Sequence, residues 1–270
     1  MSLFKNKFEK AEDYYFGRNG KKQNYEKALK LYIEVEPNNS LAGYRIGVMY
    51  ANGYGVQEDR KTAAKYFERN GDWASSHLYI GQFYLFGWAD YPQDTNKAIE
   101  HIKKSTGMEK NASHLLGKIY ADKKYGINDL ATAAEWMEKA AAQGHEDAKK
   151  WLNENAAAIK KAKQDKQVQS AKNRERENNE AYDKANSFIK QNDYKSAIPL
   201  FAKVAQTDSD ARIRGSAALQ IARIYFLGGG GVFFDNEKAA EWATKAKENA
   251  LKVNDKETVK AADDILMECD

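Results

Sequence analysis

The chain has 270 residues, of which 42% are hydrophobic and 30% charged, and these proportions of a globular protein exclude an intrinsically disordered chain. The 43 basic and 39 acidic residues are interleaved and leave a net charge of +4, without the basic run typical of a nucleic-acid-binding protein. Residues 1–7 become charged before any secretory apolar stretch forms, and no segment reaches the roughly 18 apolar residues of a membrane span, so we expect a cytoplasmic protein.

A period of 35 residues organises the N-terminal half of the chain. Four alanines follow one another at this interval, and a related segment returns near the C-terminus: Ala28, Ala63, Ala98, Ala133 and then Ala239. A tyrosine precedes each alanine by 13 or 14 residues: Tyr15, Tyr50, Tyr84, Tyr120 and Tyr225. Gly47, Gly81 and Gly117 each lie three residues before a tyrosine, so a small residue shares a helix face with an aromatic one.

Glycine-containing turns divide each repeat into two helical segments. They lie at residues 53–56, 87–90, 125–128 and 228–232. Because glycine tolerates positive φ and ends helices, each repeat is predicted to be a helix–turn–helix unit. One unit cannot bury its apolar face alone, so the units must stack into an all-α solenoid.

Residues 154–180 match no repeat and consist mostly of charged helix formers without a sustained apolar stripe. We therefore predict three parts: an N-terminal repeat block at 1–153, an exposed charged helical linker at 154–180, and a C-terminal repeat block at 181–270.

The repeats resemble the Sel1-like repeat, a relative of the tetratricopeptide repeat. The resemblance is best in residues 111–148, which contain Gly117, Tyr120 and the run Ala133-Ala134-Glu135-Trp136. Residues 42–71 and 217–246 resemble the same repeat, and residues 74–107 are a degenerate copy. Residues 11–37 and 181–208 resemble plain tetratricopeptide repeats. The resemblance implies a right-handed α-solenoid in two blocks joined by a long charged helix.

No catalytic, cofactor or metal site emerges from the sequence. Residues 228–231 are four glycines, but no Gly-Lys-Ser/Thr follows them, so a structural turn is favoured over a phosphate-binding loop. The four histidines lack the short spacings of a zinc motif, although His77 and His114 fall on first helices of neighbouring repeats and could approach each other. Cys269, the single cysteine, allows no internal disulfide and is interpreted as a free thiol rather than a nucleophile.

Side chains on the inner face of the first helices are the candidate partner-binding site. In tetratricopeptide-like stacks these helices line the concave surface, and residues there without a repeat role are the informative ones. The predicted contacts are Tyr44, Val48, Leu78, Gln82, Phe86, His114 and Lys118. Their apolar members are expected to anchor a peptide or helix.

The pattern therefore predicts an adaptor or scaffold that binds another protein or peptide. A cognate inhibitor, such as a toxin-neutralising immunity protein, needs the same kind of surface and stays open as an alternative. An enzyme built on the solenoid is the alternative of a different class. The identity of the partner and the oligomeric state are left open.

Overall fold

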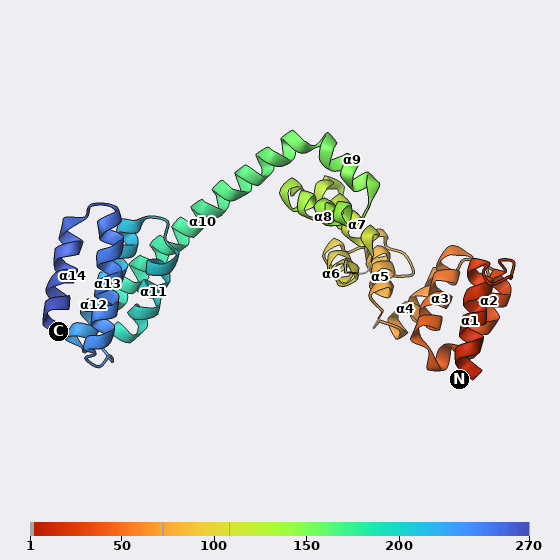
Figure 1. Cartoon of the computed structure of the whole chain (residues 1–270), viewed down its shortest axis with the longest axis horizontal. Helices are drawn as coiled ribbons and strands as arrows, with labels where there is room; N and C mark the ends of the chain where they lie inside the picture. Colours follow the sequence, from red (N-terminus) through yellow and green to blue (C-terminus); the bar gives the residue numbers. More distant parts are fainter. Residues whose placement is uncertain (1–2, 72, 108, 270) are drawn as a thin grey trace. The chain divides into compact units, whose positions relative to one another are not determined.

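The chain is helical throughout the part that its computed structural model describes, which is residues 3–71, 73–107 and 109–269. No strand occurs in these residues, and consecutive helices pack against each other in pairs (Figure 1). The predicted all-α solenoid is confirmed. The α-helices are α1 Leu3–Phe16, α2 Tyr25–Val35, α3 Ser40–Asn52, α4 Arg60–Arg69, α5 Ala74–Phe86, α6 Thr95–Ser105, α7 Lys110–Ala121, α8 Leu130–Ala142, α9 Glu146–Glu154, α10 Ala156–Lys190, α11 Tyr194–Thr207, α12 Ala211–Leu227, α13 Asn236–Lys252 and α14 Lys256–Cys269, with 3-10 turns η1 Glu36–Asn38 and η2 Lys123–Tyr125.

A main-chain hydrogen bond closes the turn of each of five repeats in the same way. The N–H of the residue that caps the second helix donates to the carbonyl of a tyrosine on the first helix, over 2.8–2.9 Å. The donor and acceptor pairs are Asn24–Tyr14, Asp59–Tyr50, Asp94–Tyr84, Asp129–Tyr120 and Asp235–Tyr225. The first repeat thus uses Tyr14 rather than the predicted Tyr15, because the periodic spacing of 13 or 14 residues does not distinguish two adjacent tyrosines.

The same capping residues begin the second helices. Each side chain accepts a hydrogen bond from a backbone N–H in the first turn, for example Asp94 from Lys97 and Asp235 from Lys238. Each backbone carbonyl accepts from the repeat alanine four residues later, as Asp94 does from Ala98. A carboxylate there satisfies N–H groups that would otherwise have no partner in the helix, and it complements the positive helix terminus.

The predicted repeat glycines lie where two helices meet. A Cβ atom at Gly81 would be 2.5 Å from Cγ1 of Ile102, and one at Gly117 would be 2.8 Å from Cγ of Met137. Ile102 and Met137 belong to the second helices and are fully buried. Each glycine therefore gives room to a large side chain of the paired helix, as the small-residue pattern predicts.

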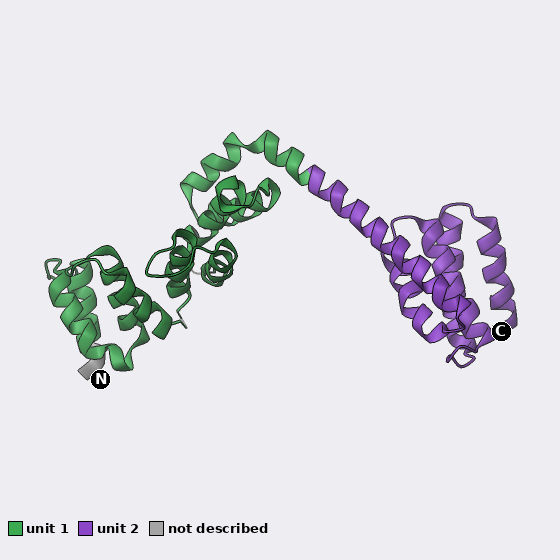
Figure 2. Cartoon of the chain, turned by 180° about the vertical axis from the view of Figure 1, so that it is seen from behind, with its two compact units in different colours: residues 1–163 green, residues 164–270 purple. Residues whose placement is uncertain are grey.

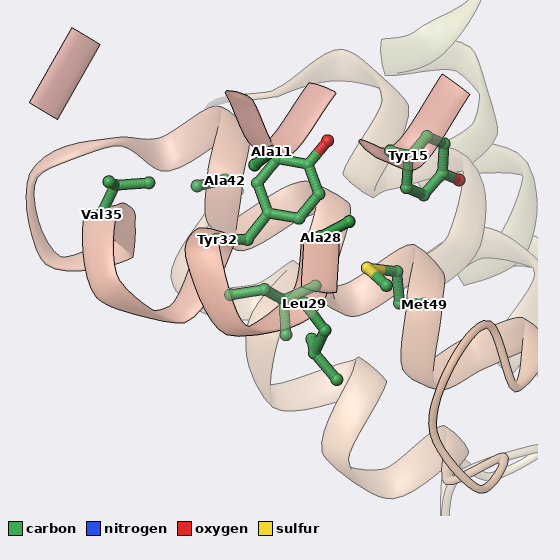
Figure 3. Close-up of a cluster of buried hydrophobic side chains, with 9 residues drawn as sticks. Ala11, Tyr15, Ala28, Leu29, Tyr32, Val35, Ala42 and Met49 are labelled. Atoms are coloured by element: carbon green, nitrogen blue, oxygen red, sulfur yellow. The ribbon is translucent and has the colours of Figure 1, made fainter. Parts of the chain in front are cut away.

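The first repeats share a core in which one polar group is included. Ala11, Ala28, Leu29, Tyr32 and Met49 are among the buried side chains of this cluster, which Figure 3 shows in close-up. The Tyr32 hydroxyl donates to Oε1 of Glu12 over 2.6 Å, and Arg45 Nε donates to the same oxygen over 2.8 Å. A half-buried carboxylate thus ties α1, α2 and α3 together.

Two compact units divide the chain, residues 1–163 (unit 1) and 164–270 (unit 2), and Figure 2 colours them separately. The boundary falls inside α10. Near its start Ile159 is buried and Lys163 pairs with Glu138 over 2.8 Å, whereas near its end Asn178 is buried and donates to Asp208 over 3.1 Å. Only residues 164–177 are exposed throughout, so the solvated stretch is shorter than the segment 154–180 that lacks a repeat pattern.

Candidate functional site

Two of the predicted apolar anchors, Val48 and Leu78, belong to the core of unit 1. Val48 is 7% exposed and packs with Phe67 and Phe83, and Leu78 is 8% exposed and packs with Ile102 and others. Neither side chain offers surface to a partner. The prediction assumed that α3 and α5 face solvent at these positions, but the stacking of neighbouring repeats covers them.

Tyr44 lies half-buried in a ring cluster with Phe67 and Tyr79. Its ring centroid is 6.0 Å from that of Phe67 and 6.4 Å from that of Tyr79, and the Phe67 and Tyr79 rings stack at 4.5 Å. Burial, together with Tyr79 and Glu109, raises the pKa of Tyr44 to about 12, while Ser75 and Arg45 act to lower it. The phenol therefore stays neutral.

Phe86 remains accessible, at 42% exposure, on the last residue of α5. Its ring lies 4.7 Å from that of Trp88, and the guanidinium of Arg60 lies 3.9 Å from the centroid of Trp88. This stack of Phe86, Trp88 and Arg60 combines apolar area with a cation–π contact. Gln82, one turn earlier on α5, is half-buried.

The histidines pair differently from the prediction. His77 meets His101 of its own repeat, with 3.2 Å between the two Nδ1 atoms, and His114 meets His145, with 4.0 Å between ring centroids. The sequence interpretation brought His77 and His114 together, but each instead contacts a histidine that follows it in the chain. Among the described residues, no group of three or more His, Cys, Asp or Glu side chains is placed to hold a metal ion.

His114 and Lys118 do come together, and they line a groove of about 780 Å³ against α8 and α9. We call it the α7–α9 groove. Its lining residues are His114, Lys118, Ala121, Asp122, Lys123, Asn128, Met137, Asp147, Lys150, Trp151 and Glu154. Both sides of the groove carry charge, whereas Ala121 and Trp151 supply apolar surface.

The surroundings of His114 in the groove favour the neutral form of its imidazole. Burial lowers the pKa of His114, His145 and Lys118 lower it further, and Asp147 opposes them. The Asp122 carboxylate accepts a hydrogen bond from the backbone N–H of Lys124, which holds its pKa below the usual range. The groove thus presents separate positive and negative groups around an indole, which suits the recognition of a charged peptide.

Four groove residues of α9 were missed by the sequence interpretation: Asp147, Lys150, Trp151 and Glu154. Residues up to 153 were assigned to the N-terminal repeat block and Glu154 to the linker, and neither assignment gave these side chains a role in binding. One signal was available, since Trp151 occupies no repeat position, unlike Trp136 and Trp242. A tryptophan outside the repeat pattern is a better candidate for binding than one within it.

The remaining candidate motifs have structural positions. Residues 228–231 form the α12–α13 turn with positive φ at all four glycines, and Cys269 Sγ lies 3.8 Å from Oδ1 of Asn236. No helix in the described part of the chain is long and apolar enough to cross a membrane.

The helices pack in pairs through small residues, and the repeats carry the α7–α9 groove. These features define a helical-repeat protein of the α-solenoid class. The chain belongs to the Sel1 repeat family. The family model for the Sel1 repeat matches more than half of it, at residues 11–34, 40–69, 74–106, 111–145 and 215–251. Residues 11–34 therefore match a Sel1 repeat rather than only a plain tetratricopeptide repeat, and residues 181–208 lie outside the matched segments.

One solved structure shares the fold. A Sel1 repeat protein from Oxalobacter formigenes superposes with a TM-score of 0.51 at 18% identity, over 91% of this chain and 87% of that one. A protective antigen from uropathogenic Escherichia coli with an SLR fold has a TM-score of 0.48 at 17% identity, over 98% of this chain and 68% of that one. No curated protein matches the sequence. Sel1 repeat proteins generally mediate protein–protein interactions and are typically non-catalytic scaffolds.

Proposed function

We propose that the chain is a protein-binding adaptor whose partner docks in the α7–α9 groove. The observation that carries the proposal is the groove itself, in which an indole lies among exposed charges of both signs. A buried aromatic anchor surrounded by complementary charges is a common arrangement at the centre of protein interfaces.

The charges indicate the kind of partner. Lys118, Lys123 and Lys150 lie with Asp122 and Asp147 around the groove. A peptide or helix with one apolar side chain for Trp151 and flanking charges of both signs would satisfy this lining. Contacts with charged groups add specificity and association rate more than affinity, so we expect binding to weaken as salt rises.

A second contact is proposed at the stack of Phe86, Trp88 and Arg60. Of the predicted contacts, Phe86 keeps an exposed ring, whereas Tyr44 and Gln82 are half-buried. An extended partner that reaches both contacts would gain avidity from one continuous chain.

The test is a charge reversal in the groove. The double variant Lys118→Glu with Lys150→Glu changes two exposed groove lysines, and Lys30→Glu with Lys65→Glu changes two exposed lysines elsewhere in unit 1 by the same net charge. Partners are captured from native cells on wild type and both variants, identified, and then titrated against each by calorimetry.

We expect the groove variant to bind the captured protein at least about tenfold more weakly, while the control variant binds as wild type does. Equal binding to all three proteins would refute the groove. An enzyme that loses its activity when captured would place the chain among inhibitors instead of adaptors.

A further inference from the structure

The turn between α12 and α13 exposes large apolar side chains. Phe233 is 93% exposed, Leu227 is 74% exposed and Phe234 is 60% exposed. We call these three residues the Phe turn. Water contact of so much apolar surface is unfavourable, so several large apolar side chains exposed on one short turn mark a binding surface.

The residue directly before the capping residue is polar in the other four repeats that share this turn: Gln23, Glu58, Gln93 and Asn128. The pair before the capping residue is Lys22-Gln23 in the first repeat and Pro92-Gln93 in the third, but Phe233-Phe234 here. Gln23 donates its side-chain amide to the carbonyl of Tyr15 over 2.9 Å, and Gln93 donates to that of Leu85 over 3.1 Å.

Phe234 occupies the position of those glutamines, and its side chain has no hydrogen-bond donor. The corresponding carbonyl belongs to Phe226, and the Phe234 ring instead lies 6.4 Å from the Phe226 ring. The repeat has therefore replaced a hydrogen bond at the helix end with an exposed ring. The loss of a local hydrogen bond in favour of a ring that stays 60% exposed is typical of a residue kept for binding.

Main-chain contacts hold the turn in place. Gly229 and Val232 exchange two hydrogen bonds of 2.9 Å, and the N–H of Lys195 donates to the carbonyl of Gly230 over 3.2 Å. A Cβ atom at Gly230 would lie 2.6 Å from the carbonyl oxygen of Asn192, so only glycine fits against α11. The Phe turn is thus presented in a defined conformation.

Three exposed cations lie on the chain segments next to the Phe turn. Lys195 lies beside Gly231, Arg223 is one helical turn before Leu227, and Lys190 is two residues from Asn192, which contacts the turn. We call Lys190, Lys195 and Arg223 the basic rim. Two nearby carboxylates cap helices: Asp193 accepts a hydrogen bond from the first turn of α11, and Asp235 accepts one from the first turn of α13. Asp235 also forms an ion pair with Lys238. Glu237 is the exposed acid next to them in sequence.

We propose that the Phe turn and its basic rim bind the surface of a lipid bilayer that contains anionic lipids. A ring exposed at 93% on a projecting turn needs no preformed pocket in a bilayer, and it enters the boundary between headgroups and acyl chains. The cations then lie at the level of the lipid phosphates, where each contributes to attraction. This contact belongs to unit 2 and is independent of the α7–α9 groove in unit 1.

The test is cosedimentation of the full chain with vesicles of phosphatidylcholine alone and of phosphatidylcholine with about 30% phosphatidylglycerol. The wild type is expected to bind the anionic vesicles, and to bind them about tenfold or more weakly when salt rises from about 0.1 to 0.5 M. The variant Phe233→Gln with Phe234→Gln is expected to lower the partition coefficient by about 100-fold, roughly tenfold for each ring.

Two further variants test whether the effect on vesicle binding is specific to the Phe turn. Ile33→Gln with Leu251→Gln removes two other exposed apolar side chains, 47% and 60% exposed, and should leave vesicle binding unchanged. Phe234→Gln should keep or raise the melting temperature, because glutamine can donate to the Phe226 carbonyl as its counterparts do. Absence of wild-type binding to anionic vesicles, or equal loss in both double variants, would overturn the proposal. A dimer that becomes monomeric on loss of the two rings, without a change in vesicle binding, would overturn it too.

Discussion

A methyl group added at Gly81 should separate α5 from α6, and the same change at Gly117 should not separate α7 from α8. At Gly81 the new Cβ atom would lie 2.5 Å from Ile102 Cγ1, 3.0 Å from the carbonyl oxygen of Ala98 and 3.2 Å from the backbone nitrogen of Ile102. Two of these atoms belong to the backbone, and Ile102 is branched and fully buried. At Gly117 the nearest atoms are all in the flexible side chain of Met137, at 2.8–2.9 Å.

The free energy follows from two opposing effects. Alanine favours a helix over glycine by about 1 kcal/mol, and overpacking of a close-packed site costs about 1–3 kcal/mol. Because backbone atoms cannot move aside at Gly81, the upper part of the overpacking cost, about 2–3 kcal/mol, applies there, and Gly81→Ala should lower the free energy of unfolding by about 1–2 kcal/mol. Gly117→Ala should change it by less than about 0.5 kcal/mol. Gly117→Leu exceeds what Met137 can accommodate and should cost about 3 kcal/mol.

Urea unfolding followed by far-UV circular dichroism measures these differences. A loss of 1 kcal/mol should also lower the melting temperature of a unit of this size by about 2–4 °C. The reasoning fails if Gly81→Ala proves as stable as Gly117→Ala, since the two sites would then accommodate a methyl group equally well.

Glu12→Ala should lower the free energy of unfolding by about 2–4 kcal/mol in the same urea assay, because Arg45 and the Tyr32 hydroxyl lose their shared partner in a half-buried site. The exposed Glu9→Ala is the control and should cost less than about 0.5 kcal/mol. Burial lowers the pKa of both His77 and His101, so they favour folding when neutral. Their contribution is complete above their unfolded pKa of about 6.5 and is lost as pH falls through the lowered folded values. Thermal melts between about pH 7.5 and pH 5 should show this loss, and His77→Gln with His101→Gln should flatten the profile; an unchanged profile would contradict the pairing.

The sequence was sufficient for the fold because the pattern that specifies it is local and repeated. Gly81 and Gly117 mark helix contacts, Ala98 and Ala133 mark the second helices, and both patterns have a fixed spacing. The capping residues were not part of that prediction, although an Asn or Asp directly precedes the second helix of each matching repeat. Because the pattern recurs five times along the chain, chance does not explain it.

The candidate site was less predictable because it depends on how repeats stack. Val48 and Leu78 share the helix face expected for contact with a partner, but the burial of that face depends on the rotation between neighbouring repeats. The His77–His101 pair depends instead on how α5 packs against α6 within one repeat. Trp151 lies where the repeat pattern ends, so periodicity could neither include it nor give it a role.

The hydrogen bond that closes each repeat turn joins two main-chain atoms and so places no demand on the side chains between them. It spans nine residues from Tyr50 to Asp59 and ten from Tyr84 to Asp94, with the same geometry. A turn can thus gain or lose a residue, or exchange its whole sequence, while the helix pair keeps its register. In evolution, and in engineering, these turns are the places where new specificity can be inserted into one repeat without redesign of its neighbours.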